Sequence, residues 1–345
     1  MDVLTVKGKS GSSQIVLDAS LDRLEEYVPD GRTFIVTDAN VERLYGDRLP
    51  SDWPRIRIGL GESAKTPETV IDAIRQLIAL EADRSVFIVG VGGGIVCDVT
   101  GFIASTFMRG VRFGFVSSTL LSQVDASVGG KNGVNVDGYK NIFGTFNQPK
   151  FVLCDTNMLA TLPIEELRCG LAEILKHILI ADVDMLPYLE ENASRALAAD
   201  QDVLRTLVAH SVRVKANVVN QDEREAGERR KLNFGHTFGH AIEKLGGLRH
   251  GEAVAIGTLF ALRLSEHRNL IQSADVARIE TLLKALGLPT TTNHPADEVL
   301  RTMRSDKKRS GADIHFVLLE RLGKARVERM PLDELEEVAR DIFME

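Results

Sequence analysis

The first half of the chain alternates short runs of β-branched and other apolar residues with helical patterns, and this alternation limits the folds open to it. A helical pattern covers residues 67–80, between two of the apolar runs. The runs are typical of buried strands and cover residues 33–37, 55–58, 86–91, 112–116 and 151–154. Strands that alternate with helices predict a layered α/β sheet.

The second half of the chain has a different pattern. After residue 161 nearly every segment shows helical spacing, as where Ile279, Leu282 and Leu286 share one face before Gly287 gives a stop signal. A chain of 345 residues is also too long for one compact core. We therefore expect an α/β domain over residues 1–160 and an all-α domain over residues 161–345, with no Pro/Gly/Ser-rich linker between them.

Composition narrows the class of protein. Hydrophobic residues make up 44% and charged residues 26% of the chain, and the net charge is -7, which argues against a general binder of nucleic acids or membrane surfaces. The sequence has no apolar signal core at its start and no apolar run long enough to span a bilayer, so we expect a cytoplasmic protein. Cys97, Cys154 and Cys169 lack CxxC spacing, and we interpret them as small buried residues.

A glycine triplet follows the apolar run at residues 86–91 and precedes a second apolar, helical segment. A strand, a glycine loop and a helix N-terminus together form a phosphate cradle, because bare backbone amides face the anion. The strict GxGxxG pattern fails by one position, since Gly90, Gly92 and Ile95 occupy its places. The alternative is a tight turn, through Gly93 and Gly94, that only packs the helix on the sheet.

Acidic and basic residues near this loop are candidates for the same ligand. Asp38 ends a strand, where a carboxylate often holds a ribose, but it precedes the glycine loop whereas the usual Rossmann order places it after. Glu62 and Lys65 lie in a second polar loop that could reach the same cofactor, or they are ordinary surface charges. We expect a variant of the Rossmann-like nucleotide-binding fold.

Residues 117–135 and 138–141 form a glycine-rich segment that carries charged and amide side chains, Asp125, Lys131, Lys140 and Asn141. Glycines allow a ligand to come close to the backbone, so we expect this segment to be a binding loop. The alternative, a flexible surface loop, is less favoured because apolar residues would anchor the segment, namely Leu120, Leu121, Val124, Val128 and Val134.

Residues 229–250 place polar groups where a buried helix should have none. Between residues 232 and 242 the sequence is almost wholly apolar or glycine, yet Arg229, Asn233, His236 and His240 fall on one stripe of a continuous helix. We interpret the stripe as a site for a metal and an anionic, hydroxyl-rich ligand. A solvated helix face is the alternative, but such a face would carry several Lys and Glu residues.

Two further helical patterns bury charge. In residues 163–180, Glu173 and Lys176 interrupt an apolar stretch, so Glu173 needs either Lys176 alone or a metal held with two imidazoles, for which His236 and His250 are candidates. In the next helix Lys215 shares a face with aliphatic residues, and a snorkelling side chain is the alternative there.

The order of these motifs over almost the whole chain resembles the 3-dehydroquinate synthase family of sugar-phosphate cyclases. The motifs are the glycine triplet, SQVDASVGGK, GYKN, GLAEILK, NFGHTFGHAIE, HGEAVA and DKK, the last ahead of an apparent strand, HFVLL. The resemblance implies a Rossmann-like nucleotide-binding α/β domain followed by an all-α metal-binding domain, as in iron- or zinc-dependent polyol dehydrogenases. It also implies a homodimer.

The resemblance implies Glu173, His236 and His250 as ligands of Zn²⁺ or Co²⁺, with His240 near the substrate and not on the metal, although spacing alone leaves His236 and His240 an equally plausible metal pair. The implied NAD⁺ contacts are Asp38, Glu62, Lys65, Gly93, Gly94, Asp98, Ser118, Thr119, Lys140 and Thr161. The implied substrate contacts are Arg109, Asp125, Lys131, Asn141, Lys176, Lys215, Arg229, Asn233, His240 and one of Lys307 and Lys308. Ser117, Ser118 and Thr119 stand where the family usually has Pro-Thr-Thr, which puts the rigidity of that loop in doubt.

The reaction implied by the resemblance converts 3-deoxy-D-arabino-heptulosonate 7-phosphate to 3-dehydroquinate and phosphate, the second step of the shikimate pathway. A transient NAD-dependent oxidation permits phosphate elimination, and reduction, ring opening and aldol cyclisation follow. The residues suited to the phosphate are Arg109, Lys131, Lys140 and Lys307, and Arg229 with Lys215 suits the carboxylate. The rival hypotheses are a net NAD-dependent polyol dehydrogenase, a related cyclase and a non-catalytic NAD- or metal-binding domain.

Overall fold

The computed structural model describes residues 2–304, 309–310 and 313–344. Its contacts divide the chain into two compact units. The first unit comprises Met1–Leu162 and Leu204–Glu223, and the second comprises Pro163–Val203 and Arg224–Glu345. A segment from the second half of the sequence therefore belongs to the first unit.

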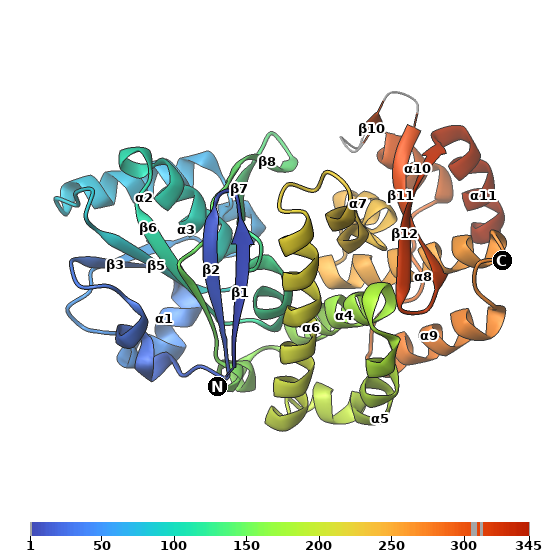
Figure 1. Ribbon diagram of the computed structural model, residues 1–345. Coiled ribbons are helices and arrows are strands. Elements are labelled where there is room, and N and C mark those ends of the chain that lie inside the picture. Colours follow the sequence, from blue (N-terminus) through green and yellow to red (C-terminus); the bar gives the residue numbers. More distant parts are fainter. Residues whose placement is uncertain (1, 305–308, 311–312, 345) are drawn as a thin grey trace. The chain divides into compact units, whose positions relative to one another are not determined.

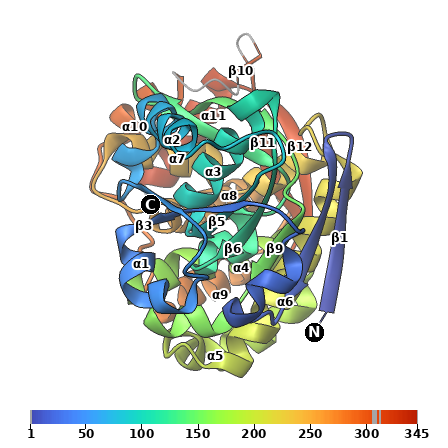
Figure 2. The same ribbon diagram turned by 90° about the vertical axis from the view of Figure 1, so that its left-hand side faces the viewer.

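The first unit contains a seven-stranded sheet in the order β1-β2-β9-β6-β5-β3-β4 (Figures 1 and 2). β1 and β2 form an antiparallel hairpin, and the pairs from β2 to β4 across the sheet are parallel. The strands are β1 (Asp2–Gly8), β2 (Gly11–Leu17), β3 (Thr33–Asp38), β4 (Arg55–Ile58), β5 (Phe87–Gly92), β6 (Arg112–Ser117) and β9 (Phe151–Cys154). The five strands expected from the sequence are confirmed, to within one residue at either end.

The strand order creates a topological switch point between β3 and β5. In chain order the strands β3, β4, β5, β6 and β9 stand as 2-1-3-4-5 across the sheet, so the connections leave β3 and β5 in opposite directions. Ligands of doubly wound sheets bind at the carboxyl ends of the strands that flank such a point. All six residues of β5 are buried, which is the expected pattern for a central parallel strand covered on both faces.

Helices α1 (Ala39–Tyr45), α2 (Pro67–Ala79) and α3 (Gly94–Thr106) connect these strands. α2 begins where the sequence predicts, because the hydroxyl of Thr66 accepts from the backbone N–H of Thr69 and Pro67 occupies the first turn. α6 (Gln201–Gln221) contributes most of its length to the same unit.

The expected binding loop at residues 117–141 is instead regular structure in large part. Ser122–Ala126 forms a π-helical turn, and β7 (Lys131–Val136) pairs with β8 (Tyr139–Phe146) in a hairpin. Asp137 and Gly138 both have positive φ, of 50° and 77°, and such a two-residue turn matches the twist of a hairpin. The expected apolar anchoring is confirmed for Leu120, Val124, Val128 and Val134, which are buried, whereas Leu121 is half-buried.

The second unit is helical, as expected, with the addition of a small antiparallel sheet (Figure 1). Its helices are α4 (Ile164–Ala181), α5 (Leu186–Leu197), α7 (His236–Leu245), α8 (His250–His267), α9 (Ser273–Ala285), α10 (Ala296–Arg304) and α11 (Leu332–Met344). β10 (Arg309–Ser310), β11 (Asp313–Arg321) and β12 (Lys324–Pro331) form the sheet, and β11 contains the HFVLL segment. Among the helices of the described residues, none has the length and apolar character needed to cross a membrane.

Candidate active site

The glycine triplet lies at the switch point and joins β5 to α3. Gly93 caps α3, and the predicted order of strand, glycine turn and helix is confirmed. A Cβ on Gly92 would lie 2.5 Å from Cβ of Val96, and one on Gly93 would lie 3.0 Å from Cγ2 of Thr119. The turn therefore depends on glycine, and it directs the N-terminus of α3 to the edge where a nucleotide phosphate binds in such folds.

Asp38 lies at the end of β3, on the other side of the switch point. Its carboxylate accepts from the backbone N–H groups of Asn40 (2.8 Å) and Val41 (3.0 Å) and so caps α1. The hydroxyl of Thr37 donates to the carbonyl of Val91 (2.8 Å) and ties β3 to β5. The cap explains the local structure, and a contact between Asp38 and a ribose stays a prediction.

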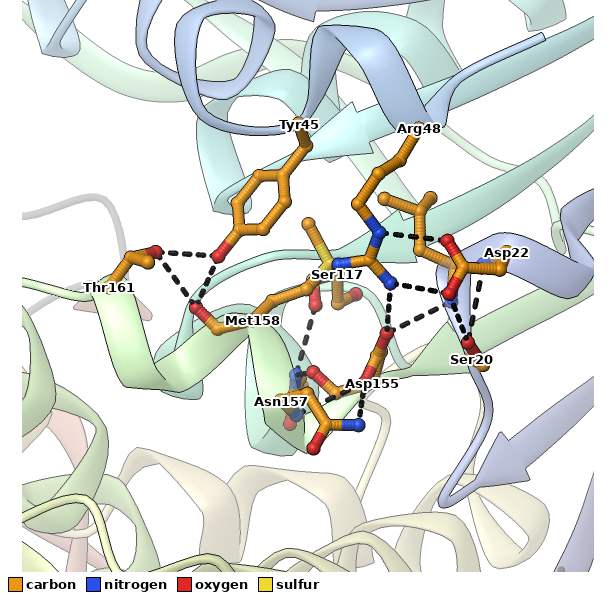
Figure 3. Close-up of polar contacts among 11 residues, drawn as sticks. Ser20, Asp22, Tyr45, Arg48, Ser117, Asp155, Asn157, Met158 and Thr161 are labelled. Carbon is orange, nitrogen blue, oxygen red and sulfur yellow. Dashed lines mark hydrogen bonds and ion pairs between the residues drawn. The ribbon is translucent and has the colours of Figure 1, made fainter.

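Ser118, Thr119 and Thr161 have local hydrogen bonds. The backbone N–H of Ser118 donates to the carbonyl of Gly92 (2.9 Å), and the hydroxyl of Thr119 donates to Oγ of Ser122 (3.0 Å). Figure 3 shows the hydroxyls of Tyr45 and Thr161 next to each other and to the carbonyl of Met158. The two hydroxyl oxygens lie 2.5 Å apart. Tyr45 was not singled out by the sequence pattern.

Lys65 is the centre of a second group in the first unit. Only 5% of it is exposed, and its Nζ lies 2.5 Å from Oδ2 of Asp98 and 2.6 Å from Oδ1 of Asn141. Burial raises the pKa of Asp98, and the ammonium of Lys65 opposes that change. The surface-charge alternative for Lys65 is therefore wrong, and two expected cofactor residues meet one expected substrate residue.

Glu62 and Lys140 flank this group at the end of the β7–β8 hairpin. Nζ of Lys140 lies 3.9 Å from Oε1 of Glu62, and both side chains are exposed. Asn135 joins the two segments, since its amide donates to Glu62 (2.8 Å) and its oxygen accepts from the backbone N–H of Asn141 (2.8 Å). Asn135 lies within the glycine-rich motif but is uncharged, so the charge pattern of that motif does not mark it.

Lys215 on α6 is buried and paired with Asp125. The distance from its Nζ to Oδ1 of Asp125 is 2.5 Å, and 5% of Lys215 is exposed, so the snorkelling alternative is wrong. In contrast, Lys131 and Arg109 are exposed. Arg109 follows Met108 in a turn where both have positive φ, of 68° and 50°, a strained backbone of the kind that clusters at functional sites.

In the second unit, Glu173 on α4 meets two imidazoles. Its side chain is fully buried, and its Oε1 lies 3.4 Å from Nε2 of His236 and 3.4 Å from Nε2 of His250. The other oxygen pairs with the ammonium of Lys176, which is 1% exposed. The ligand atoms of Glu173, His236 and His250 lie within 4.8 Å of one another. One carboxylate and two imidazoles form a donor set that suits Zn²⁺ or Co²⁺.

A second possible group shares His250. His240, Glu243 and His250 also offer ligand atoms within 4.8 Å of one another. Burial of His250 opposes its charged form, but hydrogen bonds to Glu173 and Glu243 outweigh burial and raise the pKa of His250 to about 10. Both carboxylates therefore make this corner of the second unit favourable for a cation.

The expected continuous helix over residues 229–242 is wrong. Glu228–Asn233 forms a 3-10 turn, α7 begins only at His236, and Gly235 between them has φ +75°. A Cβ on Gly235 would lie 2.6 Å from Oγ1 of Thr258 on α8, so close approach of α8 requires glycine here. Arg229 and His236 are nevertheless buried, whereas Asn233 and His240 are half-buried.

Glu225 is a residue of this cluster that the sequence pattern missed. The amide of Asn233 donates to Oε1 of Glu225, and Nε of Arg230 donates to its backbone carbonyl (3.3 Å). Glu225 has φ +62°, and a positive φ at a residue other than glycine leaves no sequence signal. Lys307 and Lys308 lie outside the described residues.

A nucleotide-type α/β unit with a glycine turn, followed by a helical unit with a carboxylate and imidazole metal group, defines the architecture of the sugar-phosphate cyclases. Residues 55–169 match the family model of the 3-dehydroquinate synthase N-terminal domain, and residues 170–309 match that of the C-terminal domain. The chain belongs to the 3-dehydroquinate synthase family.

Individual relatives agree with this assignment. A 3-dehydroquinate synthase of Thermoanaerobacter pseudethanolicus is 39% identical in an alignment of 351 positions that covers 97% of this chain and 99% of that protein. The solved 2-deoxy-scyllo-inosose synthase with carbaglucose-6-phosphate, NAD⁺ and Co²⁺ has a TM-score of 0.86 at 26% identity over 99% of this chain and 100% of its own. The 2-epi-5-epi-valiolone synthase of Streptomyces hygroscopicus with NAD⁺ and Zn²⁺ has a TM-score of 0.87 at 29% identity over 99% and 98%.

Proposed function

We propose that the protein converts 3-deoxy-D-arabino-heptulosonate 7-phosphate to 3-dehydroquinate and phosphate, as a phosphate-eliminating lyase of the shikimate pathway. The observation that carries the proposal is the group of Glu173, His236 and His250 beside buried Lys176, in a chain whose two halves match both family models. A net polyol dehydrogenase would share the nucleotide fold and the metal group but would not need the many cations around a carboxylate and a phosphate.

NAD⁺ and a Zn²⁺ or Co²⁺ ion, when bound, supply the hydride acceptor and the polarisation of the substrate hydroxyl. We assign NAD⁺ to the domain of residues 1–160, where the backbone N–H groups of Gly93 and Gly94 at the start of α3 would bind the pyrophosphate. The remaining proposed contacts are Asp38, Glu62, Lys65, Asp98, Ser118, Thr119, Lys140 and Thr161.

The substrate carries a carboxylate and a phosphate, and each needs a cation. Arg229 is buried and offers a planar fork that binds a carboxylate through two hydrogen bonds, and Lys215 adds a second charge. Arg109 and Lys131 are exposed, long side chains that suit a phosphate dianion, with Lys140 and Asn141 on the hairpin and Lys307 as further contacts. Asp125 holds Lys215 in place, so it orients the ammonium as well as contacting substrate.

Glu173, His236 and His250 are the proposed metal ligands in the helical domain of residues 161–345, and Lys176 balances the charge of Glu173. The ring of His240 has its centroid 5.2 Å from that of His236 and 6.0 Å from that of His250. We assign His240 and Asn233 to the substrate rather than to the metal. We expect His236→Ala to lose metal and activity together and His240→Ala to keep metal and lose turnover. Metal loss from both variants would refute the ligand assignment.

The reaction itself is tested by incubating metal-loaded protein with the heptulosonate phosphate and a catalytic amount of NAD⁺. Inorganic phosphate and NADH absorbance are followed together. Stoichiometric phosphate without lasting NADH supports the synthase, because NAD⁺ is regenerated in each turnover. Sustained NADH formation with excess NAD⁺ would instead establish a dehydrogenase, and no change in either signal would favour a related cyclase substrate.

We also propose that the protein works as a cytoplasmic homodimer without a nucleic-acid or membrane partner. The family resemblance supports the dimer, and the net charge of -7 disfavours nucleic acid. Light scattering coupled to gel filtration tests the dimer, and a monomer mass at micromolar concentration would refute it.

A further inference from the structure

The two imidazoles of the proposed metal group are oriented in the same manner. Nδ1 of His236 lies 3.0 Å from the carbonyl oxygen of Phe234, while its Nε2 lies 3.4 Å from Oε1 of Glu173. A carbonyl oxygen can only accept, so Nδ1 of His236 carries the proton and Nε2 is left to bind a metal. The backbone itself thus orients His236.

His250 repeats this arrangement with a side chain in place of the backbone. Its Nδ1 lies 3.4 Å from Oε2 of Glu243, and its Nε2 lies 3.4 Å from Oε1 of Glu173. Glu243 lies on α7 at helical spacing from His236 and His240, and its side chain is 10% exposed. A carboxylate so nearly buried needs a partner, and the N–H of His250 meets that need.

We propose that Glu243 is a positioning residue for the metal site, which accepts a hydrogen bond from Nδ1 of His250 and so turns Nε2 toward Glu173. The inference rests on the proposed function, because it needs the proposed metal group. Partners of this kind fix the tautomer and orientation of a ligating histidine, and their removal costs about 10- to 100-fold in metal affinity.

A competing geometry exists, in which Glu243 binds the metal directly together with His240 and His250. That geometry would not use His236 or Glu173 as ligands. The two arrangements make opposite demands, since positioning by Glu243 requires His236 as a ligand and direct ligation does not.

The test measures Zn²⁺ affinity of metal-free protein by competition with a chromophoric chelator at one fixed pH. Glu243→Leu removes the acceptor, and we expect its Kd for Zn²⁺ to rise about 10- to 100-fold. Glu243→Gln keeps an oxygen acceptor at the same position, so its Kd for Zn²⁺ should rise less. Glu266→Gln, which removes one negative charge from the far end of α8, is the matched control and should bind as the wild type does.

The absorption spectrum of the Co²⁺-loaded protein separates positioning from ligation. Positioning predicts that Glu243→Gln keeps the wild-type spectrum at saturating metal, although its affinity for the metal is weaker. Unchanged Zn²⁺ affinity in both Glu243 variants overturns the inference, as does full metal retention by His236→Ala. A wild-type protein that binds neither Zn²⁺ nor Co²⁺ would overturn the proposed metal site itself, a result distinct from failure of Glu243 alone.

Discussion

Replacement of Glu223 tests how the turn of the β1–β2 hairpin is joined to the segment just after α6, because the Glu223 carboxylate makes several hydrogen bonds there. Oε2 accepts from the backbone N–H of Lys9 (2.7 Å) and Ser10 (3.3 Å), and Oε1 accepts from the hydroxyl of Ser10 and from Nε2 of Gln148 (3.1 Å). Gly8 leaves the room that the carboxylate fills, since a Cβ there would overlap it.

The expected magnitude follows from the loss of these bonds. A hydrogen bond to a charged group contributes about 1.5–3 kcal/mol when buried, but Glu223 is only half-buried and water can replace it at the backbone N–H groups. We therefore expect Glu223→Ala to lower the free energy of unfolding of the first unit by about 2 kcal/mol, well below the sum of the separate bonds. Glu223→Gln keeps one acceptor and should lose about 1 kcal/mol.

The loss should also depend on pH. Burial alone would raise the pKa of Glu223, but hydrogen bonds from Ser10, Gln148 and the backbone N–H of Lys9 lower it overall. A folded pKa below the unfolded value of about 4.3 gives a stabilisation that is present above that pH and lost as the pH falls through the folded pKa. The difference between wild type and Glu223→Gln should therefore be larger at pH 7 than near pH 4.

The assay uses Trp53, the single tryptophan of the chain, which lies in the first unit and packs against its core. Urea unfolding followed by its fluorescence reports on the unit that contains Glu223. Glu26→Gln, in an exposed pair with Arg23, is the matched control and should unfold as the wild type does. A wild-type midpoint for Glu223→Ala would refute the contact argument, and a loss that is equal at pH 7 and pH 4 would refute the role of charge.

Two other predictions concern burial. All three cysteines are buried, namely Cys97, Cys154 and Cys169, and burial raises the pKa of Cys154 to about 12 and that of Cys169 to about 11. Native protein at pH 8 should therefore not react with a chromogenic disulfide reagent. Protein unfolded in urea should react at all three thiols and release three equivalents of the chromophore. Fast reaction of the native protein would contradict this. Gly251→Ala would place a Cβ against the Cα of Cys169, so we expect the free energy of unfolding to fall by about 1–3 kcal/mol. Zn²⁺ binding should also weaken, because His250 is the adjacent residue. An unchanged melting temperature and Zn²⁺ affinity would contradict this and show that α8 can shift.

Regular structure was predictable because its signals are local. β4 and β9 have the bounds that the sequence suggests, and α2 begins at its cap and proline. The break before α7 was not predictable, because Gly235 adopts φ +75° where α8 passes close at Thr258, and only the folded structure brings that residue near. The Asp137-Gly138 dipeptide is itself a typical hairpin turn sequence. The other glycines nearby made the whole segment look like an irregular loop.

The members of the candidate site were predictable in part, and their partners were not. Buried charge within an apolar pattern identified Glu173, Lys176 and Lys215. The pairing of Lys215 with Asp125, 90 residues away, depends on where α6 packs, and periodicity says nothing of that. Likewise, spacing allowed His240 as a partner of His236, whereas the distances from Glu173 favour His250, because α8 begins beside α4.

The buried pair of Glu173 and Lys176 ties the fold of the second unit to its proposed chemistry. Both side chains are removed from water, at 0% and 1% exposure, and the cost of desolvating two such ions often exceeds their attraction. Aliphatic residues of similar volume would suit the apolar interior of α4 at least as well. The pair therefore adds little or nothing to the stability of the second unit. Its presence indicates that the buried carboxylate and the buried ammonium serve a function other than stability. The two imidazoles that face the other carboxylate oxygen of Glu173 indicate what that function is.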